Sequence, residues 1–379
     1  MKVEDFDNLP EMSVEPEGEG TETITIPFNP GLIRIRRDPF TLGELVDKIE
    51  HKEVNFQTSF QRKDDLWDNV KQSRLIESLL LRLPLPAFYF DEQKNDEDLY
   101  DAGVWNVIDG LQRCSVFSHF IVKKDRNLEN LEFLSKFNGF GYDQLPRGLQ
   151  RQIMQTPLTV YVVEGGTPEE VKFNIFKRIN TGGLVLTAQE IRHAMNPGIP
   201  ADFVAELANI KSFKKATCDI IKTARMEDRD FTTRFISFYL QSYENYQPDL
   251  DSFMAKGLKK LKITTLEQRE AIKSDFDKAM RTAIAVFGND AFRKRNSIND
   301  RRKPINKPLF EVLSVTFAQL TDIERKKLQE NKKKFKKKFI ELNNNSNFRY
   351  SISSGTSQRE SVFRRFKSIK NIMNETLNA

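Results

Sequence analysis

Short apolar runs alternate with helix-like hydrophobic spacing from about residue 40 to 195, a pattern that predicts a domain of mixed strands and helices. Apolar runs of strand length lie at 87–90, 104–108 and 156–165. Hydrophobic residues recur every three or four positions, as on one face of a helix, at 42–51, 69–83, 111–123 and from 168 to about 179. The acidic stretch 91–101 is expected to form a hairpin-like loop.

Two residue pairs mark helix starts. Thr41 with Glu44, and Thr187 with Glu190, have the spacing of a capping box, in which each side chain bonds the other residue's backbone N–H. After about residue 198 strand patterns stop, and helical spacing continues at 231–240, 261–287, 307–320 and 360–373. The polar stretch 343–357 is expected to be a loop before the last helix.

These patterns predict an α+β fold in three parts. Residues 1–35 are acidic and contain prolines and glycines, so we expect a flexible N-terminal segment. Residues 36–196 form the predicted α/β domain, with a boundary near Asn196. Residues 197–379 form the predicted helical domain, whose C-terminal part is basic.

Composition narrows the class of protein. With 39% hydrophobic and 30% charged residues, the chain is typical of soluble globular proteins. No apolar run reaches the roughly 18 residues that cross a bilayer, so we expect no membrane contact. Two cysteines and three scattered histidines give neither a disulfide framework nor zinc spacing. We expect a cytoplasmic protein.

Charge is unevenly distributed along the chain, although the net charge is only +6. The first 20 residues are acidic, and the basic maximum lies at 325–339. Its six closely spaced lysines are candidates for contacts with nucleic-acid phosphates: Lys332, Lys333, Lys334, Lys336, Lys337 and Lys338. The alternative is the solvated face of an amphipathic helix, because Leu328, Phe335 and Phe339 recur at helical spacing.

The turn after the apolar run 104–108 carries the first candidate site. Asp109 and Gly110 separate the predicted strand from a helix that begins with Leu111, Gln112 and Arg113. A helix N-terminus offers free N–H groups and partial positive charge, glycine permits close approach, and arginine suits phosphate oxygens. The alternative is an ordinary strand-to-helix turn.

Two more polar clusters have no place in an amphipathic pattern. Gln61 and Arg62 lie in a predicted loop between Phe60 and Trp67. Arg178 and Asn180 precede a glycine pair at the end of a predicted helix. The alternatives are a surface loop pinned by its aromatic residues and an Asn/Gly helix stop.

The order of these motifs resembles the N-terminal domain of the GmrSD-type modification-dependent restriction endonucleases, a domain found in many prokaryotic anti-phage proteins. The resemblance covers about residues 40 to 240. It rests on FQR…W, LIESLLLRLPLP, WNVIDGLQR, FKRINTGG, LTAQEIR and RMEDRDFTTRFISFYL in this order.

The resemblance implies a small ParB/sulfiredoxin-like mixed sheet with helices, followed by an all-α domain. It also implies a nucleoside triphosphate, with or without Mg²⁺, at a DGQQR-type motif. Asp109, Gly110, Gln112 and Arg113 would face the phosphates, and act in catalysis if there is hydrolysis. Gln61 and Arg62 would lie opposite, with Arg178 and Asn180 closing the pocket. Leu111 departs from the family's usual glutamine, which weakens the case for hydrolysis more than for binding.

Three functions remain open at this level. The first is a nucleotide-binding switch, with or without triphosphatase activity, in a bacterial defence system. The second is a ParB-like subunit that binds or nicks DNA. The third is a scaffold for a separately encoded defence protein or nuclease. An HNH nuclease within this chain is not expected, because no histidine follows His193.

Overall fold

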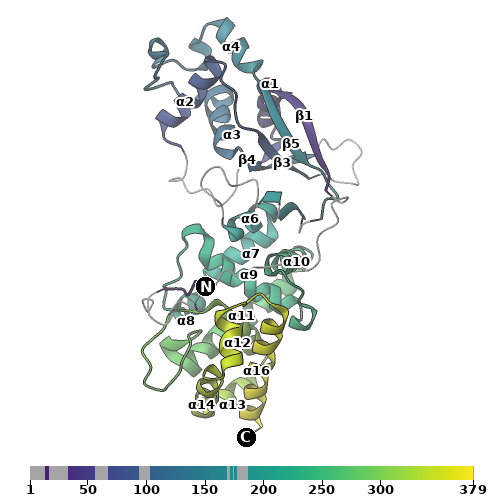
Figure 1. Cartoon of the computed structure of the whole chain (residues 1–379), viewed down its shortest axis with the longest axis vertical. Coiled ribbons are helices and arrows are strands. Elements are labelled where there is room, and N and C mark those ends of the chain that lie inside the picture. The colour runs from purple at the N-terminus through teal and green to yellow at the C-terminus, as the bar shows by residue number, and fades with distance from the viewer. Residues whose placement is uncertain are drawn as a thin grey trace. The chain divides into compact units, whose positions relative to one another are not determined.

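The computed structural model describes residues 13–16, 33–55, 67–93, 103–168, 171–173, 175–176 and 187–378. The chain divides into two compact units (Figure 1). Residues 28–186 form the first, here called the α/β unit. Residues 187–379 together with 1–27 form the second, here called the helical unit. The predicted domain boundary near Asn196 stays a prediction.

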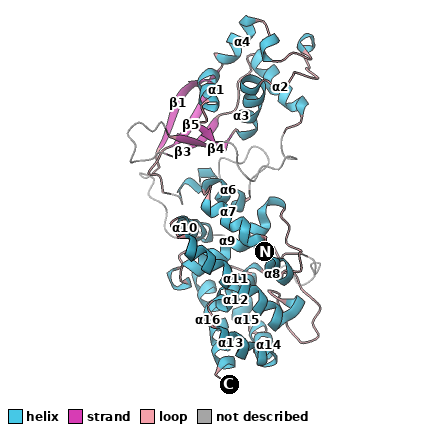
Figure 2. Ribbon diagram, turned by 180° about the vertical axis from the view of Figure 1, so that it is seen from behind, coloured by secondary structure: helices cyan, strands magenta, loops and turns pink. Residues whose placement is uncertain are grey.

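The described part of the α/β unit contains a five-stranded mixed sheet in the order β1-β5-β3-β4-β2 (Figure 2). The pairs β1/β5 and β3/β4 are antiparallel, while β5/β3 and β4/β2 are parallel. The strands are Ile35–Thr41 (β1), Val54–Asn55 (β2), Phe88–Gln93 (β3), Val104–Asp109 (β4) and Pro157–Val163 (β5). The predicted mixed sheet and its three apolar strands are confirmed.

The helices of this unit pack on one face of the sheet. Buried Phe88, Phe90, Trp105, Val107 and Val160 alternate with less buried residues along their strands and supply that face. The described helices are α1 (Leu42–Glu50), α2 (Asn69–Leu80), α3 (Leu111–Phe117), its π-helical continuation η4 (Ser118–Lys123), η5 (Ser135–Phe137), η6 (Tyr142–Gln144) and α4 (Arg147–Met154).

Local sequence explains where several of these elements begin. The capping box of Thr41 and Glu44 is formed at the start of α1, as predicted. The predicted helix 111–123 is confirmed as α3 with η4, although its second half has π-helical hydrogen bonding. From the helix predicted after Pro168, residues 171–173 and 175–176 are helical, and its remainder lies outside the described residues.

The described helical unit buries a large core rich in phenylalanine. Its helices are α6 (Ala188–Met195), α7 (Ile199–Ala208), α8 (Lys211–Ala216), η7 (Ala224–Met226), α9 (Glu227–Leu240), η8 (Tyr243–Asn245), α10 (Leu250–Lys262), α11 (Leu266–Phe287), η9 (Gly288–Asp290), α12 (Lys307–Ala318), α13 (Asp322–Glu330), α14 (Lys332–Asn343), α15 (Ser346–Ser353) and α16 (Arg359–Leu377). The capping box of Thr187 and Glu190 is formed at the start of α6. The predicted all-helical character is confirmed.

One loop prediction in this unit is wrong. The stretch 343–357 contains helix α15, which begins after Asn345. The Asn345 side chain accepts the N–H groups of Asn347 and Phe348, and Phe348 and Ile352 are buried on one side of the helix. A polar cap and two buried residues one turn apart therefore outweigh the low helix propensity of asparagine and serine.

Residues 13–16 pack on the helical unit, although they lie within the segment predicted to be flexible. Val14 forms a bridge with Ile305, and Glu15 is buried. Ile35, at the end of the same predicted segment, begins β1. No helix among the described residues is long and apolar enough to cross a membrane.

Candidate functional site

The turn from β4 to α3 requires glycine at position 110. Gly110 has a φ angle of 99°, in the region that side chains rarely adopt. A Cβ atom there would lie 2.5 Å from Cδ1 of Phe88. The backbone of the turn therefore lies directly against the Phe88 ring, and α3 begins without a side-chain cap.

Arg113 ties this turn to the start of β3. The side chain is buried, and its guanidinium lies 4.1 Å from the centre of the Phe88 ring. It donates hydrogen bonds to the carbonyl oxygens of Pro86 and Ala87 and, over 2.9 Å, to the Asp109 carboxylate. Burial lowers the pKa of Arg113, and Asp109 partly offsets this effect. The guanidinium of Arg113, predicted from the sequence to bind phosphate, is thus hydrogen-bonded to three oxygen atoms of the protein itself.

Gln112 bonds the turn to Trp67, which follows the predicted loop of Gln61 and Arg62 in the sequence. Its Oε1 accepts a hydrogen bond from the Trp67 N–H over 3.1 Å. Trp67 is the first described residue after that predicted loop. The expected positions of Gln61, Arg62, Arg178 and Asn180 lie outside the described residues.

Asp109 remains accessible at the end of β4. Its side chain is 38% exposed, in contrast to the buried Arg113 with which it pairs. It lies opposite Tyr89 in the β3–β4 register, and the Tyr89 ring stacks on Tyr161 at 5.0 Å between ring centres. Burial, Tyr161 and Asp109 raise the pKa of Tyr89. Sequence analysis did not single out this tyrosine pair, although both residues interrupt runs of buried residues.

The two other residues of the turn point to the core. Leu111 packs against the hydrophobic core of the α/β unit, so the departure from the family motif lies on the core side. Cys114 is fully buried, and burial raises the pKa of its thiol to about 12. A protonated, enclosed thiol is a packing residue.

With the strand, turn and helix in place, comparison with known proteins identifies the domain. The family described as GmrSD restriction endonuclease, N-terminal domain, matches residues 42–196. Residues 42–196 belong to this family. A comparison with curated proteins gave no match.

The residues that match the GmrSD-type family do not coincide with either compact unit of the structure. The match begins after β1, yet β1 pairs with β5 along its whole length. At its other end the match includes α6, which lies in the helical unit. The sheet of this GmrSD-type domain is therefore completed by residues before the match, and its last helix packs with residues after it.

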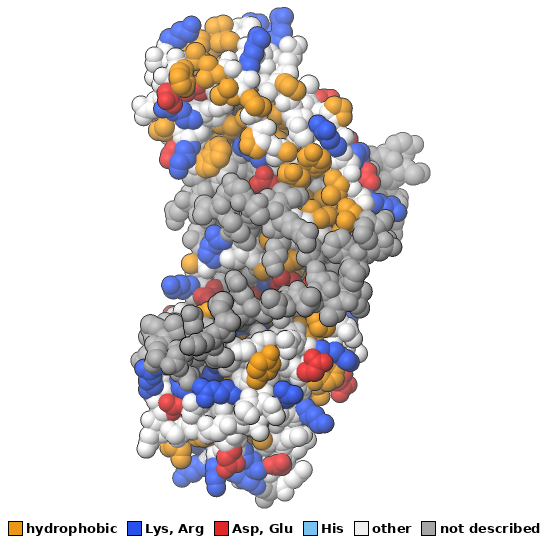
Figure 3. Space-filling view, viewed as in Figure 1, with side chains coloured by type: hydrophobic (Ala, Val, Ile, Leu, Met, Phe, Trp, Pro, Cys, Tyr) orange, Lys and Arg blue, Asp and Glu red, His pale blue; other side chains and the backbone are white. Residues whose placement is uncertain are grey.

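The second candidate surface lies on α13 and α14 of the helical unit. The lysine-rich run is divided at Asn331, so it forms two helices rather than the single helix expected. Phe335 and Phe339 are buried, while Lys332, Lys333, Lys334 and Lys337 are exposed. Lys336 is half-buried, and Lys338 pairs with Glu375 on α16. Lys and Arg side chains appear at the end of the helical unit where Figure 1 labels α13 and α14 (Figure 3).

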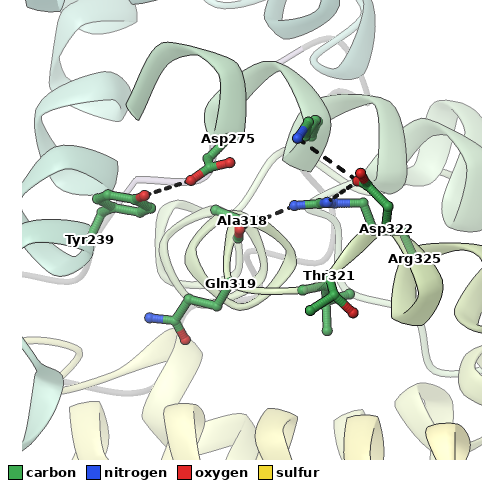
Figure 4. Close-up of a pocket in the computed structure, with 9 residues that line it drawn as sticks. Tyr239, Asp275, Ala318, Gln319, Thr321, Asp322 and Arg325 are labelled. Atoms are coloured by element: carbon green, nitrogen blue, oxygen red, sulfur yellow. Dashed lines mark hydrogen bonds and ion pairs between the residues drawn. The ribbon is translucent and has the colours of Figure 1, made fainter. Parts of the chain in front are cut away.

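A cavity of about 670 Å³ also opens in the helical unit, between α9, α11, α12 and α13 (Figure 4). Its charged side chains are already engaged. The Tyr239 hydroxyl donates to Asp275 over 2.7 Å, and Asp322 pairs with Arg325 at 2.7 Å and with Lys278 at 3.8 Å. Since these charges compensate one another, we assign no ligand to the cavity.

Proposed function

We propose that the GmrSD-type domain binds a nucleoside triphosphate at the β4–α3 turn. On this proposal the chain is a nucleotide-responsive component of a prokaryotic anti-phage or restriction-type defence system. The family membership of residues 42–196 supports the restriction role. The geometry of the turn supports the ligand.

The observation that carries the proposal is the uncapped start of α3 beside an accessible carboxylate. Gly110 provides no side-chain cap at the start of the helix, and the partial positive charge of a helix N-terminus favours an anion there. Asp109 is the accessible acid of the same turn. A triphosphate brings negative oxygens for the N–H groups, and Mg²⁺ bound to its phosphates can take a carboxylate oxygen.

The residues of the motif have different roles in this proposal. Arg113 and Gln112 are positioning residues, because their side chains are bonded to the start of β3 and to Trp67. Arg62 and Arg178 remain the candidates for direct phosphate contact, with Gln61 and Asn180 beside them. Leu111 supplies no polar group, so we propose binding as the primary activity and hydrolysis as its secondary one.

The test is thermal unfolding of the chain with each nucleoside triphosphate, with and without Mg²⁺. Ligand at a hundredfold above its dissociation constant should stabilise the protein by about 2.7 kcal/mol. Arg62→Ala should remove the shift. Arg151→Ala is the matched control, because Arg151 is exposed on α4.

Arg113→Ala is a poor probe of binding, since the buried guanidinium also holds the fold of the turn. Asp109→Asn is better suited, because an amide oxygen still accepts from Arg113 while the charge is lost. A shift that needs Mg²⁺ in the wild type and disappears in Asp109→Asn supports a metal-bridged triphosphate. The absence of a shift with every nucleotide contradicts the proposal.

A second function, binding of DNA by the lysines of α14, is favoured by their exposure above a buried phenylalanine face. Binding should weaken steeply with salt, because each phosphate that a lysine neutralises releases counterions. On this proposal DNA is nicked either by the α/β unit itself or by a separately encoded nuclease, for which the chain serves as the scaffold.

Fluorescence anisotropy with a short DNA duplex at several salt concentrations tests this second function. The triple variant Lys332→Gln, Lys333→Gln and Lys334→Gln should lower the salt slope by about 0.9 for each DNA phosphate that it no longer neutralises. The matched control replaces three exposed lysines of α10 in the same way: Lys259, Lys260 and Lys262. Equal slopes in both triple variants contradict a site on α14.

A further inference from the structure

The sheet of the α/β unit has a second face, opposite the one on which α1, α2, α3 and α4 pack (Figure 2). Buried Phe88, Phe90 and Val160 point to the helices. Because side chains alternate along a strand, the residues between them point to the second face. They include Tyr89 of β3 and Tyr161 of β5, which are only half-buried. The second face therefore presents two accessible aromatic side chains.

These tyrosines belong to one row of residues that crosses four strands. Arg37 of β1 lies opposite Tyr161, Tyr161 lies beside Tyr89, and Tyr89 lies opposite Asp109 of β4. The row thus ends at the accessible carboxylate of the β4–α3 turn. Neighbouring strands are about 4.8 Å apart, so the two tyrosines lie roughly 5 and 10 Å from Asp109 across the sheet.

The two tyrosine rings form a stacked pair. Their centres are 5.0 Å apart, and their planes differ by 14°. Tyr161 stands on the β5 side of Tyr89, so the other face of the Tyr89 ring is directed to β4 and Asp109. A third planar ring can extend the stack on that side, in the offset arrangement that aromatic rings prefer.

The surroundings of the pair favour a single base over a polynucleotide. Beside the pair, the same face is closed by buried Val163 and by buried Asp91, which pairs with Lys172 of the helical segment 171–173 at 2.6 Å. A polynucleotide site needs aromatic side chains for successive bases and a positively charged groove. Along the described strands this face offers one aromatic pair, and the row ends at an acid.

We propose that Tyr89 and Tyr161 form the base-binding subsite of the nucleotide site, with the nucleobase stacked on Tyr89 and its triphosphate at the turn of Asp109 and Gly110. This inference rests on the proposed nucleotide binding and adds the residues that hold the nucleoside. Stacking uses the π-face that every base has, so the subsite accepts purines and pyrimidines alike. Mg²⁺ between the phosphates and Asp109 offsets the repulsion of their negative charges.

The test compares the four common nucleoside triphosphates with inorganic tripolyphosphate, which has the phosphates but no base. Isothermal titration calorimetry of the full chain with Mg²⁺ gives the dissociation constant of each ligand. We expect the nucleotides to bind about fivefold to 150-fold more tightly than tripolyphosphate, which is the range that stacking of one base contributes.

Substitutions at position 89 separate the aromatic face from the rest of the site. Tyr89→Leu keeps an apolar side chain without a π-face, so nucleotide affinity should fall to that of tripolyphosphate while tripolyphosphate affinity stays unchanged. Tyr89→Phe keeps the ring and should bind nucleotides as the wild type does. Tyr161→Leu removes the supporting ring and should weaken nucleotide binding selectively, which provides a second variant if Tyr89→Leu does not fold.

Tyr142→Leu is the matched control. Tyr142 is also a half-buried tyrosine of the α/β unit, and it contacts Phe120 edge-to-face rather than lying on the second face of the sheet. This variant should bind both kinds of ligand as the wild type does.

The contrary results distinguish this inference from the proposed function. If both leucine variants of the pair keep full nucleotide affinity, or weaken nucleotides and tripolyphosphate equally, the tyrosines hold no base, although the nucleotide function stands. Equal affinity of the wild type for nucleotides and tripolyphosphate has the same meaning. If single-stranded DNA binds the wild type but not Tyr89→Leu, while nucleotides bind both, the face serves a polynucleotide and the inference is overturned. If the wild type binds neither nucleotides nor tripolyphosphate, the proposed function is contradicted and the inference fails with it.

Discussion

Gly110 shows how one residue decides the geometry of the candidate site. Replacing it with alanine adds a Cβ atom 2.5 Å from the Phe88 ring at a φ angle of 99°. We expect Gly110→Ala to destabilise the protein by about 2–4 kcal/mol, from backbone strain and overpacking together. Urea unfolding of the α/β unit measures this loss.

Gly148→Ala is the control for that prediction. Gly148 lies in α4, and a Cβ atom there meets no atom within 4 Å. Alanine in a helix is about 0.5–1 kcal/mol more favourable than glycine, so this variant should be slightly more stable. A loss of stability in Gly148→Ala equal to that in Gly110→Ala would show that the turn is not the cause.

His193 makes stability depend on pH. It is 6% exposed at the end of α6, and burial, with the nearby charge of Arg229, lowers its pKa from 6.5 to about 4. The unfolded chain therefore binds a proton at a pH at which the folded protein does not. Stability from this residue is complete above pH 6.5 and is lost on acidification toward pH 4, by roughly 2–3 kcal/mol.

The measurement is the free energy of unfolding of His193→Gln and the wild type at about pH 7, 5.5 and 4.5. The variant should be less sensitive to pH across this window, because glutamine does not titrate. His51→Gln removes an exposed histidine instead and should leave the acid-dependent fall in place. An unchanged pH dependence in His193→Gln would assign the fall to other groups.

At the scale of single residues, the sequence predicts where the turn of the candidate site lies better than it predicts which groups its side chains bond. The Asp-Gly step between strand and helix was visible in the pattern, because the apolar run and the helical spacing bracket it. The inward direction of Arg113 was not, since its partners are the carbonyl oxygens of Pro86 and Ala87. Backbone carbonyls exist at every residue, so no sequence signal distinguishes these two.

At the scale of the elements, helix α15 depends on its N-terminal cap, because its asparagine and serine residues have low helix propensity. Asn345 accepts two backbone N–H groups, at 3.0 and 3.1 Å. Asn345→Ala should lower stability by about 1 kcal/mol, because both groups lose their acceptor. Thermal unfolding of the full chain measures the change.

Asn347→Ala is the matched control, since it exchanges the same residue types two positions later. Asn347 is exposed inside α15, where alanine has the higher helix propensity. This variant should be as stable as the wild type or slightly more stable. Equal destabilisation by both substitutions would mean that the cap contributes nothing specific.

The elements that pattern analysis missed share a physical cause. β1 has the sequence IRRDPFT, with polar residues and a proline, and it lies at the edge of the sheet, where it pairs with β5 alone. Edge strands tolerate such residues, so they lack a regular hydrophobic period. The break between α13 and α14 at Asn331 was missed for the opposite reason, because the buried residues on both sides keep helical spacing.

Across the helical unit, a chain of buried ion pairs connects five helices. Arg192 of α6 pairs with Asp230 of α9 at 2.7 Å and with Asp251 of α10 at 2.5 Å. The chain continues from Asp230 through Arg234 to Glu311 of α12, and from Glu311 to Arg365 of α16. These ion pairs fix α6, the last element of the family match, in the core of the helical unit.

Asp230, in the middle of this chain of ion pairs, depends on several cations to stay ionised. Burial alone raises the pKa of this carboxyl, but Lys307, Arg234 and Arg192 outweigh burial and hold the pKa far below its ordinary value. Asp230 therefore stays ionised in the core. Removing any one of these cations leaves this buried charge less compensated, so more of its desolvation penalty is left without an offset.

Arg192→Met tests this dependence. The substitution introduces an unbranched apolar side chain, leaves Asp230 short of one cation and removes one ion pair of Asp251. We expect a loss of about 3–5 kcal/mol in the free energy of unfolding. Arg281→Met breaks an ion pair of similar length, 2.6 Å to Asp277, in which the arginine side chain is 72% exposed. That control should change stability by about 1 kcal/mol or less. If the two variants lose equal stability, burial does not distinguish these pairs, and the ion pairs do not fix α6 in the helical unit.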